Sequence, residues 1–316
     1  MRRMHMQADK DLIIIGGGAA GLSAAQYAAR ANLKVLVIEE MAAGGQCLII
    51  GDLENYPGFP EPINGGEFAM LLEEQAKNFG AEFLITTASS IKKNGDLFTV
   101  ETSKGSFTSY AVILSTGAKH RHLGIPGEKE FSGRGVSYCA TCDGPFFKNK
   151  RMLVVGGGDA ACDEASFLAN LTDQVIIVHR RDRFRAQKSL ADRVLHNPHI
   201  EVRFNTEVKE IKGAMKVDSV QLFNNETGKT YEEEFDAVFI FVGSIPQTSL
   251  VPDLPKDEAG YIITDQNMET EVEGLYAAGD VRSTPFRQLV VAAGEGAIAT
   301  HCASQRIDAI KGHAYV

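Results

Sequence analysis

The 316-residue sequence has few cysteines, no excess of basic residues and no long hydrophobic run. Five Cys do not make the disulfide framework of a secreted scaffold, so a cytoplasmic protein is the default expectation. Thirty-two Lys and Arg against 41 Asp and Glu give a net charge of −9, which lacks the basic footprint of a nucleic-acid binder. The longest apolar runs, such as 237–242, are far shorter than the ~20 residues that span a bilayer. Residues 1–11 contain no apolar segment, so we expect no secretory signal.

A glycine pattern lies near the start of the chain, between a short apolar run and an Ala-rich stretch. The run predicts a buried strand and the stretch a helix. Gly16, Gly18 and Gly21 fit G-x-G-x-x-G, in which the glycines permit a tight turn, close approach to a pyrophosphate, and close helix–strand packing. A second predicted strand, 35–39, ends in Glu39, where a carboxylate accepts a ribose 2′-hydroxyl. We interpret this site as one for FAD or NAD.

The same pattern returns over residues 156–161, with Ala161 at the third glycine position. At the offset where the first copy has Glu39, the second has the basic group His179, Arg180, Arg181 and Arg185. A carboxylate repels a 2′-phosphate, whereas clustered guanidinium groups bind it through charge-assisted hydrogen bonds. The second site is therefore interpreted as one for NADPH; the alternative is a solvated basic face.

Cys139 and Cys142 form a C-x-x-C pair, which places two sulfurs within reach of a disulfide. Three interpretations compete: half of a zinc site completed by His120 and His122, two buried structural thiols, or a redox-active dithiol. The dithiol is favoured because the chain already has sites for two nucleotides, and we expect no metal. Asp143 is either the group that moves the proton in thiol–disulfide exchange or a turn residue.

Two Gly- and Pro-rich stretches, 120–128 and 243–255, predict linkers on either side of the second glycine pattern. The residues after them are too few for a separate core, so we expect the second domain to be inserted in the first. The predicted fold class is α/β, with two Rossmann-like dinucleotide-binding domains and parallel sheets. The predicted FAD-binding domain comprises 1–118 plus 249–316. The NADPH-binding domain, 119–248, carries the C-x-x-C.

Together these motifs resemble the low-molecular-weight, bacterial-type thioredoxin reductase family, from about Asp9 to the end of the sequence. The matching segments are 16–21, 44–46, 55–58, 133–136, 139–143, 156–161, 179–181 with Arg185, 278–280 and 287–288. The chain departs from the family at Cys47, which would place a third thiol near the flavin.

The resemblance implies two sets of cofactor residues. Those for FAD are Gly16, Gly18, Ala20, Gly21, Glu39, Gly45, Gln46, Asn55, Gly279, Asp280, Arg287 and Gln288. Those for NADPH are Gly156, Gly158, Asp159, Ala160, Glu164, His179, Arg180, Arg181 and Arg185, with Glu164 near the nicotinamide.

The resemblance also implies roles for the thiols. Cys142 would face the flavin, Cys139 would attack the disulfide of thioredoxin, and Asp143 would be the acid–base group. Electrons would pass from NADPH via FAD and the Cys139–Cys142 disulfide to thioredoxin, and the protein would be a homodimer.

Other functions remain open. The chain could instead be a related NADPH-dependent flavoprotein that reduces another disulfide partner. That partner would be a peroxiredoxin-system protein or a glutaredoxin-like protein. A ferredoxin-linked reductase would lack either the C-x-x-C or the Arg cluster. An oxygen-dependent dithiol oxidase would not need the Arg cluster. A non-enzymatic nucleotide sensor leaves residues 139–143 without a role.

Overall fold

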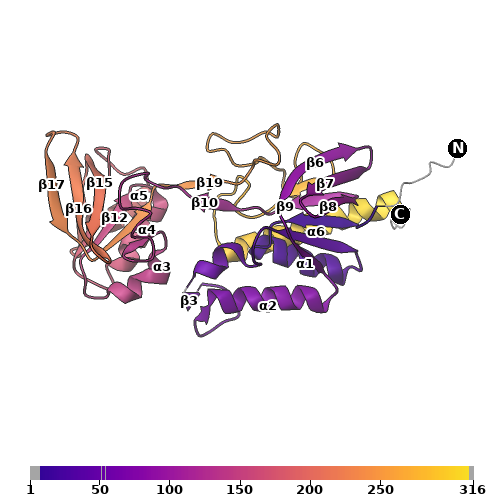
Figure 1. The fold of residues 1–316 in the computed structure, drawn as a ribbon, viewed down its shortest axis with the longest axis horizontal. Coiled ribbons are helices and arrows are strands. Elements are labelled where there is room, and N and C mark those ends of the chain that lie inside the picture. Colours follow the sequence, from indigo (N-terminus) through magenta and orange to yellow (C-terminus); the bar gives the residue numbers. More distant parts are fainter. Residues whose placement is uncertain (1–7, 51, 54, 313–316) are drawn as a thin grey trace. The chain divides into compact units, whose positions relative to one another are not determined.

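The computed structural model describes residues 8–50, 52–53 and 55–312, and their side chains apart from those of Ile49, Asp52 and Cys142. The chain divides into two compact units. The first comprises Met1–Lys119 and Ile245–Val316, and the second, His120–Ser244, is a continuous segment between them. Figure 1 labels several elements of each unit.

A five-stranded parallel sheet forms the centre of the first unit, in the order β20-β9-β1-β2-β5. Its strands are β1 (Leu12–Ile15), β2 (Val35–Glu39), β5 (Glu82–Ile85), β9 (Ala111–Leu114) and β20 (Leu275–Ala277). Every residue of β1 and β9 is buried. Continuous runs of Leu, Ile and Val suit such strands because both faces of the sheet are covered.

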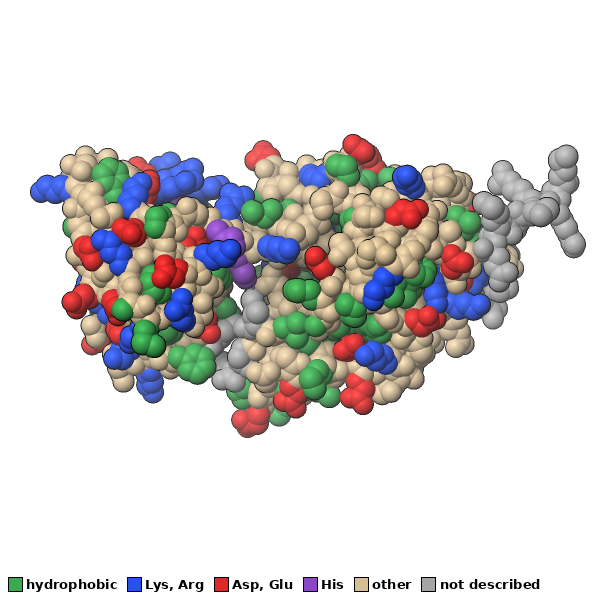
Figure 2. Space-filling model, viewed as in Figure 1, with side chains coloured by type: hydrophobic (Ala, Val, Ile, Leu, Met, Phe, Trp, Pro, Cys, Tyr) green, Lys and Arg blue, Asp and Glu red, His purple; other side chains and the backbone are tan. Residues whose placement is uncertain are grey.

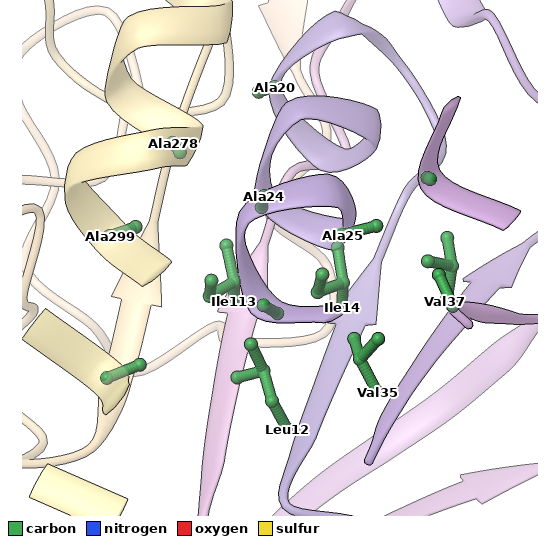
Figure 3. Packing of buried hydrophobic residues seen from close by; sticks show 14 of the residues in the cluster. Leu12, Ile14, Ala20, Ala24, Ala25, Val35, Val37, Ile113, Ala278 and Ala299 are labelled. Carbon is green, nitrogen blue, oxygen red and sulfur yellow. The ribbon is translucent and has the colours of Figure 1, made fainter. Parts of the chain in front are cut away.

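Helices cover one face of this sheet: α1 (Ala19–Arg30), α2 (Gly65–Asn78) and α6 (Leu289–Lys311). Figure 3 shows Leu12, Ile14 and Ile113 of the sheet packed below the alanines of α1, with Ala299 of α6 beside them. The antiparallel sheet β6 (Ala88–Asn94), β7 (Leu97–Thr102) and β8 (Gly105–Ser109) packs on the other face. The shorter elements are η1 (Gly45–Ile49), β3 (Asp52–Leu53) and β4 (Ile63–Asn64).

The second unit repeats this plan, with a parallel sheet in the order β11-β18-β12-β13-β14. Its strands are β11 (Val136–Ser137), β12 (Met152–Gly156), β13 (Val175–Val178), β14 (Ile200–Arg203) and β18 (Ala237–Phe241). One face packs on α3 (Ala140–Asp143), α4 (Asp159–Leu168) and α5 (Lys188–Leu195). The other packs on an antiparallel sheet of β15 (Thr206–Gly213), β16 (Val217–Asn224) and β17 (Thr230–Glu234). A short helix, η2 (Gly144–Phe147), follows α3.

The two chain segments that connect the units pair with each other as β10 (Ala118–His120) and β19 (Ser244–Pro246). Backbone hydrogen bonds extend the pairing on both sides: Arg121 N donates to Gly243 O, and Gln247 N donates to Gly117 O, each at 2.9 Å. Both connections therefore have regular hydrogen bonding within segments that the sequence predicted as linkers.

The α/β fold class with parallel sheets, predicted from the sequence, is confirmed. In the part of the chain that the structure describes, no helix is long and apolar enough to cross a membrane. Figure 2 shows acidic and basic side chains interspersed over the visible face of each unit, with hydrophobic side chains between them.

Helices α1 and α6 approach so closely that only small residues fit between them. A Cβ atom on Gly296 would lie 2.1 Å from Ala20 O. Two hydroxyl groups tie the helices together: Ser23 Oγ donates to Ala293 O at 2.8 Å, and Thr300 Oγ1 donates to Ala24 O at 3.1 Å. The backbone of α1 is thereby fixed against α6.

This contact predicts opposite effects for two glycines of one helix. Gly296→Ala should lower the free energy of unfolding by about 1–3 kcal/mol, because α1 must move away. Gly294→Ala is the matched control, since no atom of the same chain lies within 4 Å of its Cβ position. It should leave stability unchanged or raise it by up to about 1 kcal/mol through helix propensity. Urea unfolding at one protein concentration measures both, and equal effects would contradict the packing argument.

Candidate nucleotide and dithiol sites

The first glycine turn joins β1 to α1, and two of its glycines have no space for a side chain. A Cβ on Gly16, whose φ is +105°, would lie 2.3 Å from Ser115 O, and one on Gly21 would lie 1.9 Å from Gly16 O. Gly18 differs, because no atom lies within 4 Å of its Cβ position. Gly18 is the N-cap of α1 and makes no side-chain cap, so the helix N-terminus presents its N–H groups to an open space suited to a phosphate.

Glu39 lies at this turn. Its Oε2 accepts a hydrogen bond from Gly17 N at 2.7 Å, and its Oε1 accepts one from Met41 N at 3.1 Å. The segment after β2 also reaches the turn, because Gly44 N donates to Gly17 O at 2.7 Å. A Cβ on Gly45 would lie 3.1 Å from Gly18 Cα. The carboxylate at the end of β2 is therefore held beside the glycine turn, as a ribose-binding acid must be.

A second segment reaches α1 from the far end of the sequence. Gly279 has a φ of +75°, and a Cβ there would lie 3.0 Å from the Cβ of Ala20. Its N–H donates to the buried Glu295 at 2.8 Å, and the same carboxylate accepts from Arg282 at 2.5 Å. Burial raises the pKa of the adjacent Asp280, with Glu295 adding to the effect and Arg287 opposing it.

The remaining candidate residues of the first unit are also brought together from distant parts of the chain. Asn55 Nδ2 donates to Gln288 Oε1 at 3.0 Å, and Gln46 Nε2 donates to Ala118 O at 2.7 Å. The Arg287 guanidinium lies 3.8 Å from the centre of the Tyr261 ring. Segments that are far apart in the sequence are thus in contact at Asn55 with Gln288 and at Gln46 with Ala118.

The second glycine turn joins β12 to α4 and has the same construction. A Cβ on Gly156 would lie 2.3 Å from Phe241 O, whereas Gly158, the N-cap of α4, has open space at its Cβ position. A Cβ on Gly157 would lie 2.3 Å from His179 Nδ1. Arg185 N donates to Gly157 O at 2.6 Å, so the residues after β13 pack directly on the turn.

The basic group surrounds His179. Burial lowers the pKa of His179 first, and Arg181, Arg180 and Arg185 lower it further, so the imidazole is held in its neutral form. The three arginines are exposed. Among the described residues, their guanidinium groups have no ion pair or hydrogen bond. The histidine therefore packs beneath the turn, and the positive charge that a phosphate needs lies on the three arginines.

Asp159, at the first position of α4, has both carboxylate oxygens engaged by Gln187. Oδ1 accepts from Gln187 N at 2.7 Å and Oδ2 accepts from Gln187 Nε2 at 3.0 Å. Ala160 follows it in the first turn of the helix. Asp159 thus fixes Gln187, two residues after Arg185, against the N-terminus of α4.

The C-x-x-C residues lie in and beside the single turn of α3. Cys139 is disulfide-bonded, and its Sγ lies 3.4 Å from Thr141 Oγ1. The side chain of Cys142 lies outside the described part of the structure. The backbone N–H of Asp143 donates to Cys139 O at 3.2 Å, and its side chain is half-buried.

The histidines of the zinc interpretation have other contacts. His122 Nδ1 lies 2.8 Å from the Tyr138 hydroxyl, which donates to the buried Glu128 carboxylate at 2.8 Å. In the described part of the chain, no group of three or more His, Cys, Asp or Glu is arranged to hold a metal ion. Cys47 and Cys162 are buried, and burial raises the pKa of each thiol to about 11, so both are unreactive.

Glu164, which the resemblance assigns to the nicotinamide, contacts the C-x-x-C segment. It lies on α4, and its carboxylate accepts hydrogen bonds from the backbone N–H groups of Ala140 and Thr141, the two residues between the cysteines. Its Oε2 is buried with no hydrogen-bond partner among the described residues. Burial and the neighbouring Asp163 raise its pKa to about 7, against the lowering effect of the two N–H groups.

Sequence reasoning missed two residues at these sites. Glu295 is an isolated acid in the apolar sequence of α6, and such a residue signals a buried, paired carboxylate. Phe146, in η2 just after the C-x-x-C, has 81% of its surface exposed. A large exposed aromatic side chain beside a redox pair marks a surface suited to a protein partner.

The chain is similar to known proteins in family, sequence and structure. The family model "Pyridine nucleotide-disulphide oxidoreductase" matches residues 10–296. A thioredoxin reductase of Treponema pallidum (strain Nichols) is 55% identical over 97% of this chain and 100% of its own length. One from Peptoclostridium acidaminophilum is 44% identical over 95% of this chain and 97% of its own.

Solved structures agree with these matches. Lactococcus lactis thioredoxin reductase is 42% identical, with a TM-score of 0.78 over 95% of this chain and 99% of that one. The Streptococcus pyogenes enzyme is 45% identical, also with a TM-score of 0.78, over 95% and 98%. The chain therefore belongs to the pyridine nucleotide-disulphide oxidoreductase family and, within it, to the thioredoxin reductases.

Proposed function

We propose that this protein reduces the disulfide of thioredoxin with electrons taken from NADPH through FAD and a Cys139–Cys142 redox pair. The observation that carries the proposal is the repeated glycine turn with an open second glycine, followed by a held carboxylate in one unit and by exposed arginines in the other. The family membership supports the same reaction.

The first unit fits FAD. The open space at Gly18 and the uncapped N-terminus of α1 suit the pyrophosphate, and Glu39 suits the ribose hydroxyl groups. Gln46, Asn55, Asp280, Arg287 and Gln288 would hold the rest of the cofactor, together with the backbone of Gly45 and Gly279. When bound, the flavin supplies the means to convert a hydride donor into a reductant of disulfides.

The second unit fits NADPH. Gly156, Gly158 and the N-terminus of α4 would hold the pyrophosphate, and Arg180, Arg181 and Arg185 would hold the 2′-phosphate. We therefore assign 1–118 plus 249–316 as the FAD-binding domain and 119–248 as the NADPH-binding domain. The division of the chain near residues 119 and 245 supports this assignment.

The thiols of Cys139 and Cys142 perform the thiol–disulfide exchange with thioredoxin. The Cys139 thiolate attacks one sulfur of the thioredoxin disulfide, forming a mixed disulfide and releasing the other thioredoxin sulfur as a thiolate. The Cys142 thiolate then attacks Cys139 Sγ, which re-forms the Cys139–Cys142 disulfide and releases the second thioredoxin thiolate. Asp143 would move the protons that these thiolates take up or lose, and the hydrogen bond from its backbone N–H to Cys139 O supports this role by keeping it beside the pair. Exposed Phe146 would contact thioredoxin beside the reacting sulfurs.

Two further assignments belong to this proposal. The low cysteine content supports a cytoplasmic location, where thiols stay reduced. A related acceptor, a peroxiredoxin-system or glutaredoxin-like protein, is the second candidate substrate, since the C-x-x-C chemistry is the same for any accessible disulfide.

A homodimer is proposed through one face of the first unit. Large hydrophobic side chains of α1, α2 and α6 are exposed in this unit: Tyr27, Met70, Leu71, Val290 and Ile298. Tyr27, Leu71 and Val290 line the same groove. An exposed apolar surface of this kind is typical of an interface, and a second copy of the chain presents the same groove.

The arginine assignment predicts a cofactor-specific effect. Arg180→Gln with Arg181→Gln should raise the KM for NADPH by about tenfold or more, because charge-assisted hydrogen bonds to the 2′-phosphate are lost. The KM for NADH should stay the same. Arg193→Gln is the matched control, an exposed arginine of α5 that pairs with Asp163. Steady-state kinetics with NADPH and with NADH measure the two KM values. An equal rise in both would refute the 2′-phosphate role.

The thiol assignment predicts that thioredoxin reduction needs Cys139 and that flavin reduction by NADPH does not. Cys139→Ser should lower thioredoxin reduction by about a thousandfold or more, because the attacking nucleophile is gone. NADPH should still bleach the flavin absorbance, since that step does not need Cys139. Cys302→Ser, a change at a half-buried free thiol, should leave both half-reactions intact. A Cys139→Ser enzyme that keeps thioredoxin turnover would refute the proposed route.

The interface predicts a change in assembly. Leu71→Glu should place a charge in the proposed contact and shift the protein from dimer to monomer in light scattering after size exclusion. Met215→Glu is the control, because Met215 is an exposed hydrophobic residue of the second unit. Wild-type protein that is monomeric at every concentration, or an unaffected Leu71→Glu dimer, would contradict the proposal.

A further inference from the structure

Helix α4 makes two kinds of contact with the redox segment. The buried side chain of Ala140 packs with Ala161, Ala165 and Leu168 of α4. After the second cysteine, a Cβ on Gly144 would lie 2.7 Å from the Leu168 side chain. The segment that holds the cysteines is therefore pressed against the helix whose N-terminus would hold the NADPH pyrophosphate.

The polar contact between these elements is made by Glu164. Its carboxylate accepts both N–H groups between the cysteines, those of Ala140 and Thr141. In a C-x-x-C segment such N–H groups normally stabilise the thiolate of the first cysteine. Here a negative charge occupies them, and the second carboxylate oxygen is buried without a partner among the described residues.

We propose that Glu164 is a positioning residue of the C-x-x-C segment, and that its charge sets the acidity of the Cys139 thiol in the reduced enzyme. This inference rests on the proposed function, in which Cys139 is the attacking thiol. When Glu164 is ionised, it occupies the donors of Ala140 and Thr141 and repels a Cys139 thiolate. When Glu164 is protonated, it accepts less strongly, and the same donors are freed to stabilise the thiolate.

The surroundings of Glu164 make its ionisation sensitive to pH near neutrality. Burial and Asp163 raise its pKa to about 7. The strands beneath α4 that pack with it, β12, β13 and β18, contain no charged residue. The charged groups on the helices α3, α4 and α5 are Asp143, Asp159, Asp163, Lys188, Asp192 and Arg193. Of these, Asp163 pairs with Arg193 at 3.5 Å, and Asp159 binds Gln187.

The test is the rate at which Cys139 is alkylated as the pH is varied. The holoenzyme carrying Cys142→Ser is treated with iodoacetamide from pH 6 to pH 9, and modified Cys139 is quantified by peptide mass spectrometry. Adding Glu164→Gln should raise the rate about threefold or more at pH 8, because a neighbouring negative charge is removed. At pH 6 the two proteins should react alike, since Glu164 is then protonated in the parent.

Asp163→Asn is the matched control, because it removes a charge from the same helix one residue away without a contact to Ala140 or Thr141. It should leave the alkylation rate at pH 8 unchanged, because Glu164 is ionised there with or without Asp163. Hydrogen exchange gives a second readout, in which Glu164→Ala should speed exchange of the Ala140 and Thr141 amides most. Glu164→Gln, whose neutral oxygen accepts less strongly than a carboxylate, should speed it less. Should the alanine variant fail to fold, the glutamine variant still decides the inference.

Profiles of Glu164→Gln and its parent that coincide at every pH would overturn the inference. A shift of equal size in Asp163→Asn would also overturn it, since the effect would then be general to the helix. The assay uses neither NADPH nor thioredoxin. A shifted profile in an enzyme that fails to turn over thioredoxin therefore supports the role of Glu164 while refuting the proposed function.

Discussion

The close approach of a helix N-terminus to the end of a buried parallel strand is the constraint on which both units depend. It leaves 1.9 Å between a hypothetical Cβ on Gly21 and Gly16 O, and 2.3 Å between one on Gly156 and Phe241 O. Glycine is required at those positions by packing alone. The open positions, Gly18 and Gly158, are not required by packing, and they lie where N–H groups face outward. The same turn thus separates the glycines that permit the fold from those that leave room for a phosphate.

In the second unit, helix α4 contributes to both the candidate nucleotide site and the candidate dithiol site. The N-terminus of α4 faces the open space at Gly158, and about one and a half turns later Glu164 holds the N–H groups between the cysteines. Apolar contacts of Ala140 with the same helix fix the spacing. A displacement of α4 on binding a nucleotide would therefore move the redox segment with it. The N-terminus of α4 and the C-x-x-C segment are therefore connected through contacts within this unit.

The sequence predicted the repeated strand–turn–helix units, because glycine spacing and apolar runs reflect local geometry. It also placed Glu39 and the arginines, since each follows a strand at a fixed offset. It could not predict contacts set by tertiary packing, such as Glu295 on Gly279 or Asn55 on Gln288, whose partners are distant in the sequence. Glu164 shows the limit most clearly: its position on the helix was predictable, and the backbone groups that it binds were not.

Glu39 in the first unit and the three arginines in the second differ in their hydrogen bonding as well as in charge. Both oxygens of Glu39 are already hydrogen-bonded to backbone N–H groups, so the carboxylate is fixed before any ligand arrives. Arg180, Arg181 and Arg185 are exposed, and their guanidinium groups make no ion pair or hydrogen bond with the described residues, so a ligand must order them. Ordering side chains on binding costs free energy, whereas a preorganised site avoids that cost. A fixed acid suits a cofactor that stays bound, and exposed arginines without other side-chain partners suit a nucleotide that leaves after each turnover. Under the proposed function, the same glycine turn would therefore serve a resident FAD in one unit and an exchanging NADPH in the other.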